Sequence, residues 1–327
     1  MRRAPAFWAR PPGLLSDLLW PVGVGWDATG RLRRALARPH HPAVPVICVG
    51  NLVAGGAGKT PVALALAARL AESGAAVHIV TRGYRGHLSG PVRVDPARHD
   101  FTAVGDEALL LGAHAPCWVA RNRAEGIQTA VSAGAQMVIL DDGYQNPTIA
   151  KTVSLLVVDD AYGFGNGRVI PAGPLREALA RGLARADAAV LLGADAWPRD
   201  PVTLGIDAAL PVITAALRPV AGERLARERL LAFAGIGRPD KFFATLRRLG
   251  SELIETRSFP DHHPFRTGEI DALLYAAERA RARLITTAKD IVRIPAEKRV
   301  AIEVLEVEIS WRDPDALDVL LRSVAGA

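Results

Sequence analysis

Residues 50–60 read Gly-Asn-Leu-Val-Ala-Gly-Gly-Ala-Gly-Lys-Thr, between an apolar run at 45–49 and a helical pattern that opens with Thr60-Pro61. Glycines between a strand and a helix let successive backbone N–H groups point at a phosphate. In such a P-loop the lysine neutralises β- and γ-phosphate oxygens, and the hydroxyl after it ligates Mg²⁺. We therefore predict a nucleoside triphosphate site formed by Gly55, Gly56, Ala57, Gly58, Lys59 and Thr60, with Thr60 also on the metal.

This loop departs from the strict G-x-x-x-x-G-K-[ST] pattern, because the position five before Gly58 is Val53. The main alternative to a kinase is a P-loop switch ATPase or GTPase that acts on a membrane or protein partner. Dimeric membrane-partitioning ATPases carry a lysine directly before Gly-Gly, where this chain has Ala54. A GTPase needs an Asn-Lys-x-Asp guanine reader, and the sequence Thr-Ala-Lys-Asp at 287–290 places its lysine one residue late. Both observations weigh against the switch.

Short apolar runs alternate with helical patterns along most of the chain, which is typical of a parallel sheet covered by helices on both faces. Strands are predicted at 45–49, 77–81, 136–140, 155–158 and 188–192, with a first helix from Thr60 to near Gly74. A second series begins at Leu230, with strands at 252–254, 284–286 and 304–307 and helices at 239–249 and 268–283. We predict a P-loop NTPase-like, doubly wound α/β core domain at 41–221. A smaller α/β domain is predicted at 222–327, with room for its last residues to pack back on the core.

Asp141 and Asp142 end the apolar run at 137–140. An acidic doublet after a strand is often a plain turn. Beside a P-loop, however, carboxylates at the C-terminal end of a strand are the expected partners of Mg²⁺. We interpret the pair as a Walker B-like site for the metal or nucleotide.

The first 40 residues form a third segment, in which Trp8, Trp20 and Trp26 flank four leucines. The run at 13–26 is broken by Asp17 and Pro21 and falls short of the roughly 20 apolar residues that span a bilayer. One interpretation is an amphipathic helix lying in the membrane interface, with arginines on anionic lipid. The other is a helix docked on the domain core.

The composition limits the partners. The formal net charge is +6, but only five of the forty basic residues are lysine, and no zinc finger, RNP pattern or basic helix accompanies them. We therefore expect no nucleic-acid partner. The two cysteines suggest no disulfide framework and favour a reducing compartment.

Nine motifs in order, from the N-terminal hydrophobic segment to about residue 293, resemble the tetraacyldisaccharide 4′-kinase family, the lipid A 4′-kinases of Gram-negative bacteria. They are Val-Gly-Asn-Leu-x-x-Gly-Gly-x-Gly-Lys-Thr at 49–60, Arg-Gly-Tyr at 82–84, Gly-Asp-Glu at 105–107, Asp-Asp-Gly-Tyr-Gln at 141–145, Gly-Phe-Gly-Asn-Gly at 163–167, Pro-Ala-Gly-Pro-Leu-Arg-Glu at 171–177, Gly-Ile-Gly at 235–237, Asp-His at 261–262 and Ala-Lys-Asp at 288–290. The resemblance implies Mg²⁺-dependent transfer of the ATP γ-phosphate to the 4′-hydroxyl of a lipid-linked tetraacyldisaccharide 1-phosphate.

The resemblance also implies roles for individual residues. Asp106 and His262 would form the catalytic base dyad, and Lys59 would act on the transferred phosphate. Asp141, Asp142, Glu107 and Thr60 would organise the metal. The residues expected to surround the disaccharide or the phosphates are Tyr84, Arg121, Arg123, Gln145, Arg176 and Lys289. Because Asp106 and His262 fall in different predicted domains, we expect the smaller domain to close on the core.

A substrate with four acyl chains stays in the bilayer, so the resemblance favours membrane contact by the N-terminal segment. It implies a peripheral protein on the cytoplasmic leaflet of the inner membrane, and we expect a monomer. A soluble small-molecule kinase, the second rival, would not need that segment.

The sequence departs from the family pattern at Asn146, where the family has His. Asn cannot take a proton near neutral pH, so we predict that catalysis does not depend on this position.

Overall fold

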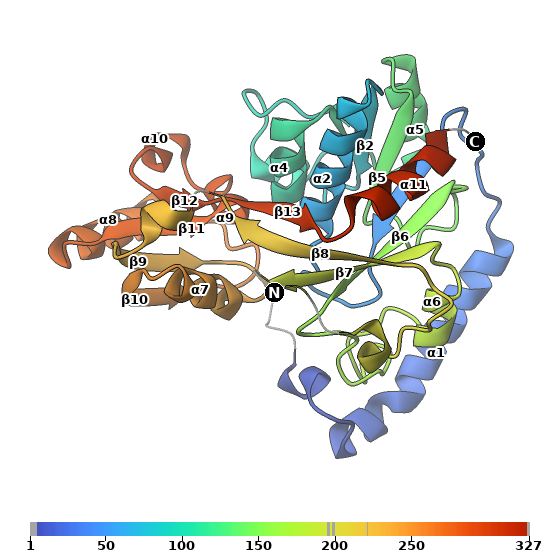
Figure 1. Ribbon diagram of the computed structural model, residues 1–327, viewed down its shortest axis with the longest axis horizontal. Helices are drawn as coiled ribbons and strands as arrows, with labels where there is room; N and C mark the ends of the chain where they lie inside the picture. Colours follow the sequence, from blue (N-terminus) through green and yellow to red (C-terminus); the bar gives the residue numbers. More distant parts are fainter. Residues whose placement is uncertain (1–4, 195–196, 198–199, 221, 326–327) are drawn as a thin grey trace.

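The computed structural model describes residues 5–194, 197, 200–220 and 222–325. Residues 1–4 of the predicted N-terminal segment, residue 221 at the end of the predicted core domain, and residues 326–327 lie outside this description. Two β-sheets organise the chain, each at the centre of its own lobe (Figure 1).

The larger sheet has nine strands among the described residues. In spatial order they are β13 (Val307–Trp311), β8 (Val212–Pro219), β7 (Ala188–Ala194), β6 (Val153–Asp159), β1 (Val46–Gly50), β5 (Met137–Asp141), β2 (Val77–Thr81), β4 (Cys117–Val119) and β3 (Val92–Arg93). Only the two edge strands run antiparallel to their neighbours. The predicted mostly parallel, doubly wound sheet is confirmed.

Helices cover both faces of this sheet, which explains why its central strands are apolar along their whole length. One face is covered by α2 (Lys59–Glu72), α4 (Asp106–His114) and α11 (Pro314–Ala325). The other is covered by α5 (Arg123–Ser132) and α6 (Leu179–Leu183). The short α3 (Phe101–Val104) precedes α4, and three 3₁₀ turns lie at Ala6–Ala9, Pro201–Leu204 and Gly222–Leu225.

The smaller sheet has four parallel strands in the order β10 (Glu252–Ser258), β9 (Arg229–Ala234), β11 (Arg283–Thr287) and β12 (Glu303–Leu305). Its helices are α7 (Pro239–Arg248), α8 (Thr267–Arg279), α9 (Ala288–Ile291) and α10 (Ala296–Arg299). A separate apolar cluster fills each side of this sheet. The second βα series predicted from Leu230 onward therefore forms a second lobe.

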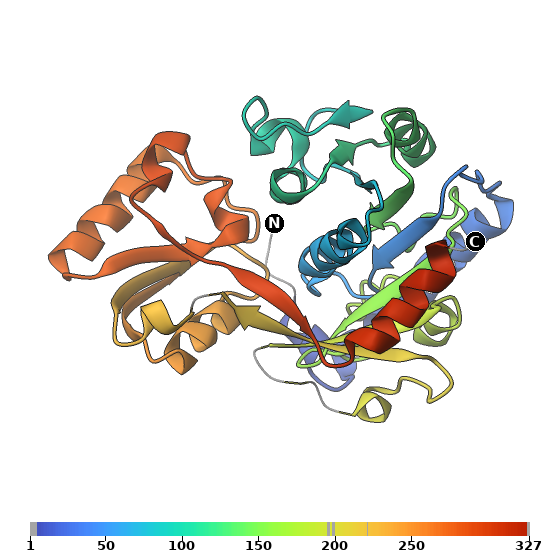
Figure 2. The same cartoon turned by 45° about the horizontal axis from the view of Figure 1, so that its top comes forward.

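The chain returns from the small lobe to the large one near its end. The single strand predicted at 304–307 is in fact two strands, since β12 ends in the small sheet and β13 pairs with β8 in the large one. Figures 1 and 2 both show β13 leading from the small lobe to α11, which packs beside α2 through a pair between Arg69 and Asp318 at 2.6 Å. The division at residue 222 stays a prediction.

The N-terminal segment contains one long helix, α1 (Leu14–Leu36), which runs along the outside of the large lobe (Figure 1). Its buried residues are Ser16, Gly23 and Asp27, whereas Leu14 is 93% exposed and Leu18 is 76% exposed. The helix thus docks on the large lobe through these buried residues and leaves its leucines exposed, and both interpretations of the segment stay predictions. Among the described residues, no helix has the length and apolar character to cross a membrane.

Candidate active site

The glycine-rich loop connects β1 to α2 at the carboxyl edge of the large sheet, where ligands of such sheets bind. Gly58 has φ +84°, and a Cβ there would lie 2.3 Å from Leu192 Cδ2, so only glycine fits. Asn51 is fully buried and holds both ends of the loop. Its Nδ2 donates to Val53 O at 2.9 Å, and its Oδ1 accepts from Lys59 Nζ at 3.3 Å. The predicted P-loop is thus a strand–loop–helix unit with its lysine held at the first turn of the helix.

Asp142 lies directly against this loop, because β5 runs beside β1. Its Oδ1 is 3.5 Å from Lys59 Nζ and 3.0 Å from Arg176 Nη1. Burial would raise the pKa of Asp142, but the charges of Lys59 and Arg176 outweigh it and lower the pKa to about 2. The residue is therefore an anion at any physiological pH.

Asp141 has the opposite environment. Thr81 donates to its Oδ2 at 3.1 Å, while its buried Oδ1 has no hydrogen-bond partner among the described residues. Burial, followed by the negative charges of Glu107 and Asp142, raises the pKa of Asp141 to about 7. A buried carboxylate oxygen without a partner is a group that a cation would stabilise.

These residues suit Mg²⁺. Within the described residues, no cluster of three or more His, Cys, Asp and Glu side chains is arranged to hold a metal by itself. Mg²⁺ in phosphotransferases takes one or two carboxylates and completes its shell with phosphates and water. Asp141, with its free oxygen, and the hydroxyl of Thr60 at the start of α2 match that requirement.

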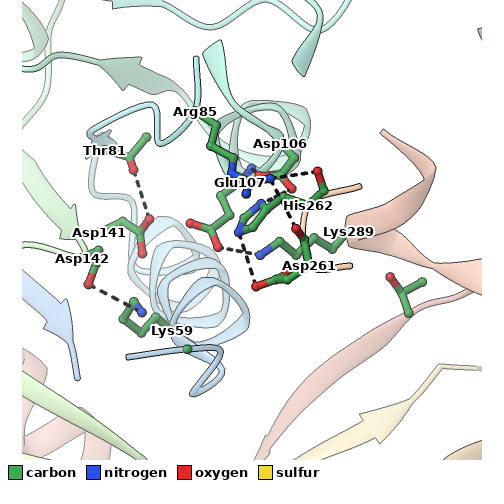
Figure 3. A network of polar contacts seen from close by, with 12 residues as sticks. Lys59, Thr81, Arg85, Asp106, Glu107, Asp141, Asp142, Asp261, His262 and Lys289 are labelled. Carbon is green, nitrogen blue, oxygen red and sulfur yellow. Dashed lines mark hydrogen bonds and ion pairs between the residues drawn. The ribbon is translucent and has the colours of Figure 1, made fainter. Parts of the chain in front are cut away.

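A second cluster lies between the lobes, where Asp106 begins α4 and His262 follows β10 (Figure 3). His262 Nδ1 lies 2.7 Å from Asp106 Oδ2. Burial would raise the pKa of Asp106, but the hydrogen bond from His262 and the charges of Lys289 and Arg293 outweigh it and lower the pKa. Asp106 is thus an anion that fixes the Nδ1–H tautomer of the imidazole and leaves Nε2 as the basic nitrogen.

The backbone of His262 is held in the left-handed region, at φ +59°. Its N–H donates to Gly235 O at 2.9 Å, and Arg85 Nη1 donates to its carbonyl at 3.0 Å. Tyr84 packs edge-on against the imidazole, with ring centroids 5.4 Å apart. A cavity of about 210 Å³ opens beside this pair, lined by Arg85, Phe101, Thr102, Asp106, His262, Pro264 and Arg293.

Glu107 and Lys289 face one another between the two clusters, with Lys289 Nζ 2.8 Å from Glu107 Oε1 (Figure 3). Burial would lower the pKa of Lys289, but Glu107, Asp106 and Asp261 outweigh it and raise the pKa. The two side chains were predicted for different duties, the metal and the substrate. The structure makes them partners.

The other predicted substrate residues divide into two groups. Arg176 and Gln145 lie at the P-loop side: Arg176 Nη1 donates to Gln145 Oε1 at 3.3 Å, and Gln145 Nε2 donates to Asn51 O at 2.9 Å. Arg123 is buried and donates to Ala120 O at 2.9 Å, and burial lowers its pKa. The side chain of Arg121, in contrast, is directed to the 82–90 loop, where it reaches Gly86 O at 3.5 Å.

Three arginines of the site have no assigned role in the sequence prediction. Arg85 holds the carbonyl of His262, as described above. Arg293, 1% exposed, lies 3.3 Å from Asp106 Oδ2, pairs with Asp290 and donates to Gly235 O at 2.9 Å. Arg85 directly follows the Arg-Gly-Tyr motif at 82–84, and Arg293 lies three positions after the Ala-Lys-Asp motif at 288–290. Their position next to family motifs was the sequence feature that could have identified them.

The third is Arg238, which joins the small lobe to the P-loop. Its Nη2 donates to Gly56 O at 2.7 Å, and its Nη1 donates to Asp159 Oδ1 at 2.9 Å. Lys241 also pairs with Asp159, so two cations of α7 and its N-cap hold one carboxylate at the end of β6. Arg238 directly follows the quoted Gly-Ile-Gly motif.

A P-loop and an Asp-supported imidazole together have the parts needed to pass a phosphoryl group to a hydroxyl. Fold and site together define a P-loop phosphotransferase. A sequence profile described as tetraacyldisaccharide-1-P 4′-kinase matches residues 15–325. The chain belongs to the tetraacyldisaccharide 4′-kinase family, as its motifs predicted.

Individual relatives agree with this assignment. The chain is 55% identical to the tetraacyldisaccharide 4′-kinase of Rhodospirillum centenum over 325 residues, covering 98% of this chain and 96% of the relative. It is 52% identical to that of Paramagnetospirillum magneticum, with 97% of each chain covered. A crystal structure of LpxK from Aquifex aeolicus in complex with ATP matches with a TM-score of 0.75 at 25% identity, covering 95% of this chain and 99% of the other. The kinase interpretation is thereby confirmed over the switch ATPase or GTPase.

Proposed function

We propose that this protein transfers the γ-phosphate of ATP to the 4′-hydroxyl of a tetraacyldisaccharide 1-phosphate, a step in lipid A formation. The observation that carries the proposal is the 2.7 Å contact between Asp106 and His262 across the two lobes, in a chain that also holds a P-loop. Its support from outside this chain is the activity named for the relatives and the ATP bound to the Aquifex protein.

In this mechanism Nε2 of His262 accepts the proton of the sugar hydroxyl. The hydroxyl oxygen forms a bond to the γ-phosphorus, and the bond between that phosphorus and ADP breaks. Asp106 stabilises the imidazolium that forms, since it stays anionic. Lys59 and the N–H groups of the loop neutralise the transferred phosphate. Mg²⁺, when bound, supplies further charge neutralisation; Thr60, Asp141, Asp142 and Glu107 are the residues we propose to hold it.

We also propose that Tyr84, Arg121, Arg123, Gln145, Arg176 and Lys289 surround the disaccharide or the phosphates. Arg176 is the best placed of these for a phosphate, because its guanidinium already pairs with Asp142 beside Lys59. A forked guanidinium suits phosphate geometry. Arg123, which is buried against backbone carbonyls, would act by holding the end of β4.

The cytoplasmic leaflet of the inner membrane is the proposed location, with α1 as the contact. Leu14, Leu18 and Leu36 are each more than 70% exposed along this helix. Exposed leucines and tryptophans on one helix suit the headgroup boundary of a bilayer. Leu14→Gln with Leu18→Gln should reduce co-sedimentation with phosphatidylglycerol vesicles, whereas Val300→Gln, a 93% exposed apolar site in the small lobe, should not. Equal binding by all three proteins would contradict the assignment.

The direct test incubates the purified protein with γ-labelled ATP, Mg²⁺ and a lipid A disaccharide 1-phosphate. The expected product is a labelled bisphosphorylated lipid. Hydrolysis of ATP without labelled lipid, at any protein concentration, would instead support an ATPase. Transfer of label to a water-soluble glucosamine phosphate alone would support a small-molecule kinase.

A further inference from the structure

The inner face of α1 is polar, which is unusual for a helix that packs on a core. Its buried residues, Ser16, Gly23 and Asp27, contact backbone atoms of one loop, at 169–178. Ser16 Oγ donates to Ala172 O at 2.8 Å, and a Cβ on Gly23 would lie 2.8 Å from Val169 O. Further contacts lie just outside this loop, since Asn166 Nδ2 donates to Ser16 Oγ at 3.3 Å and Arg168 Nη2 lies 2.8 Å from Asp17 Oδ1.

The same loop carries Arg176. Trp26 Nε1 donates to Arg176 O at 3.2 Å, and Asp27 Oδ1 accepts from Ala178 N at 2.9 Å. Asp27, 7% exposed, also pairs with Arg181. Two side chains of adjacent helix positions therefore hold the backbone on both sides of Glu177.

Glu177 is the buried link between α1 and the phosphate site. It is 2% exposed; Arg34 Nη1 of α1 lies 3.2 Å from its Oε2, and Arg185 donates to its Oε1 at 2.8 Å. Gln145 Nε2 donates to the same Oε1 at 3.3 Å, while Gln145 Oε1 accepts from Arg176 at 3.3 Å. From Arg34, the chain of contacts runs through Glu177, Gln145 and Arg176 to Asp142, which Lys59 also contacts.

We infer that Arg34 is a positioning residue for phosphoryl transfer: α1, through Arg34 and Glu177, fixes Gln145 and Arg176 against Asp142. The inference rests on the proposed function of Arg176 and Gln145 at the phosphates. A buried carboxylate that loses one of its cations must find another partner or shift its position. Without Arg34, Glu177 would draw more strongly on Gln145, and Arg176 would lose its second acceptor.

The test compares Arg34→Gln with Arg33→Gln, in the full-length protein and in detergent micelles that hold the lipid substrate. Arg33 is exposed on the same turn, so both variants lose the same charge from the membrane-facing helix. We expect kcat to fall about tenfold in Arg34→Gln, because the buried Glu177 loses one cation of its ion pairs, and to stay unchanged in Arg33→Gln. Arg34→Lys, which keeps the charge, should return to within about threefold of the original rate.

Two further readouts separate positioning from a loss of stability. The effects of Arg34→Gln and Gln145→Ala on kcat, measured well below the Tm of each variant, should be non-additive, since both act through Glu177. The binding of MgATP can be measured by calorimetry without lipid. Arg34→Gln should raise the Kd for MgATP by about threefold relative to Arg33→Gln, because Arg176 and Lys59 both contact Asp142.

The outcomes distinguish the two proposals. Wild-type protein without lipid phosphorylation would overturn the proposed function, and the MgATP measurement would still judge the linkage. Active wild-type protein with equal kcat and equal MgATP Kd in the Arg33 and Arg34 variants would overturn the linkage alone. Additive effects of Arg34→Gln and Gln145→Ala would also overturn it.

Discussion

The two halves of the active site are built in different ways. Lys59, Asp141 and Asp142 belong to one lobe, and adjacent strands of one sheet place them (Figure 3). Asp106 and His262 come from different lobes and are 156 positions apart in the chain, and Lys289 and Glu107 are 182 apart. The first half is fixed by the sheet itself, whereas the second exists only while the lobes are together. Nucleotide binding and base catalysis should therefore respond differently to change.

The largest effect is expected at the pair between the lobes. His262→Ala removes the proposed base, and kcat should fall by about 10³-fold, within the range for a general base. Binding of MgATP, measured by calorimetry, should stay close to that of the original protein, because the P-loop side is intact. Asp106→Asn combined with His262→Ala should lose little beyond the larger single loss.

The adjacent histidine provides the control. The His263 side chain forms a hydrogen bond with Glu269 at 3.0 Å and, in the part of the chain that the structure describes, no hydrogen bond or ion pair with Asp106, so His263→Ala should keep most of the activity. A loss centred on His263, or a loss of MgATP affinity equal to the loss of kcat in His262→Ala, would remove the distinction between the halves.

The two adjacent aspartates should affect stability in opposite directions. The pKa of Asp141, about 7, lies above its unfolded value of 3.8, so between these values the folded state holds more protons and stability falls as pH rises. The pKa of Asp142, about 2, is depressed, so its contribution is present above 3.8 and is lost as pH falls through 2. At pH 8 without Mg²⁺, Asp141→Asn should raise Tm by about 3 °C or more, and Asp142→Asn should lower it.

Mg²⁺ sharpens this comparison. If Asp141 is a metal ligand, adding Mg²⁺ with a non-hydrolysable ATP analogue should raise the Tm of the original protein more than that of Asp141→Asn. The measurement is differential scanning fluorimetry from pH 5 to pH 8. Parallel Tm curves for the two aspartate variants would show that their environments do not differ as described.

A smaller effect is expected where the two halves touch. Arg238 of the small lobe donates to Gly56 O of the P-loop. Through this contact, the position of the small lobe can affect nucleotide binding. Arg238→Gln should raise the KM for ATP by about three- to tenfold with a smaller change in kcat. Arg247→Gln, on the exposed end of α7, is the matched control; equal kinetics in the two variants would mean that the halves are independent here.

The sequence predicts the first half of the site better than the second for a physical reason. A strand, a glycine-rich turn and a helix are local, and the carboxyl ends of parallel strands meet at one edge, so Lys59 and Asp142 follow from spacing. The Asp106–His262 contact required family resemblance, because nothing local relates the two residues. Arg85, Arg238 and Arg293 were missed because most of the forty basic residues are arginine, and composition hides the few that contact the site.

The fold has a similar limit at residue 306. The sequence from 303 to 311 reads as one β-rich run, Glu-Val-Leu-Glu-Val-Glu-Ile-Ser-Trp, without a glycine or proline to break it. The structure divides it between two sheets, with Leu305 beside Thr287 and Val307 beside Pro219. Periodicity predicts that a segment is a strand, but the partner strand is decided by the packing of distant elements.

The smallest effect is expected at Asn146, where the family pattern has His. Its Oδ1 accepts from Thr148 N at 2.9 Å and from Thr148 Oγ1 at 2.8 Å, and its carbonyl accepts from Lys151 at 2.7 Å. These contacts hold the turn that follows Asp141 and Asp142, which is a structural role in which no proton is exchanged. Asn146→Ala should therefore lower kcat by less than about threefold, and Asn146→His should not raise it by more than that, in the lipid kinase assay. A thousandfold loss in the Ala variant with full activity in the His variant would mean that this turn carries chemistry after all, and that the P-loop half also depends on a base.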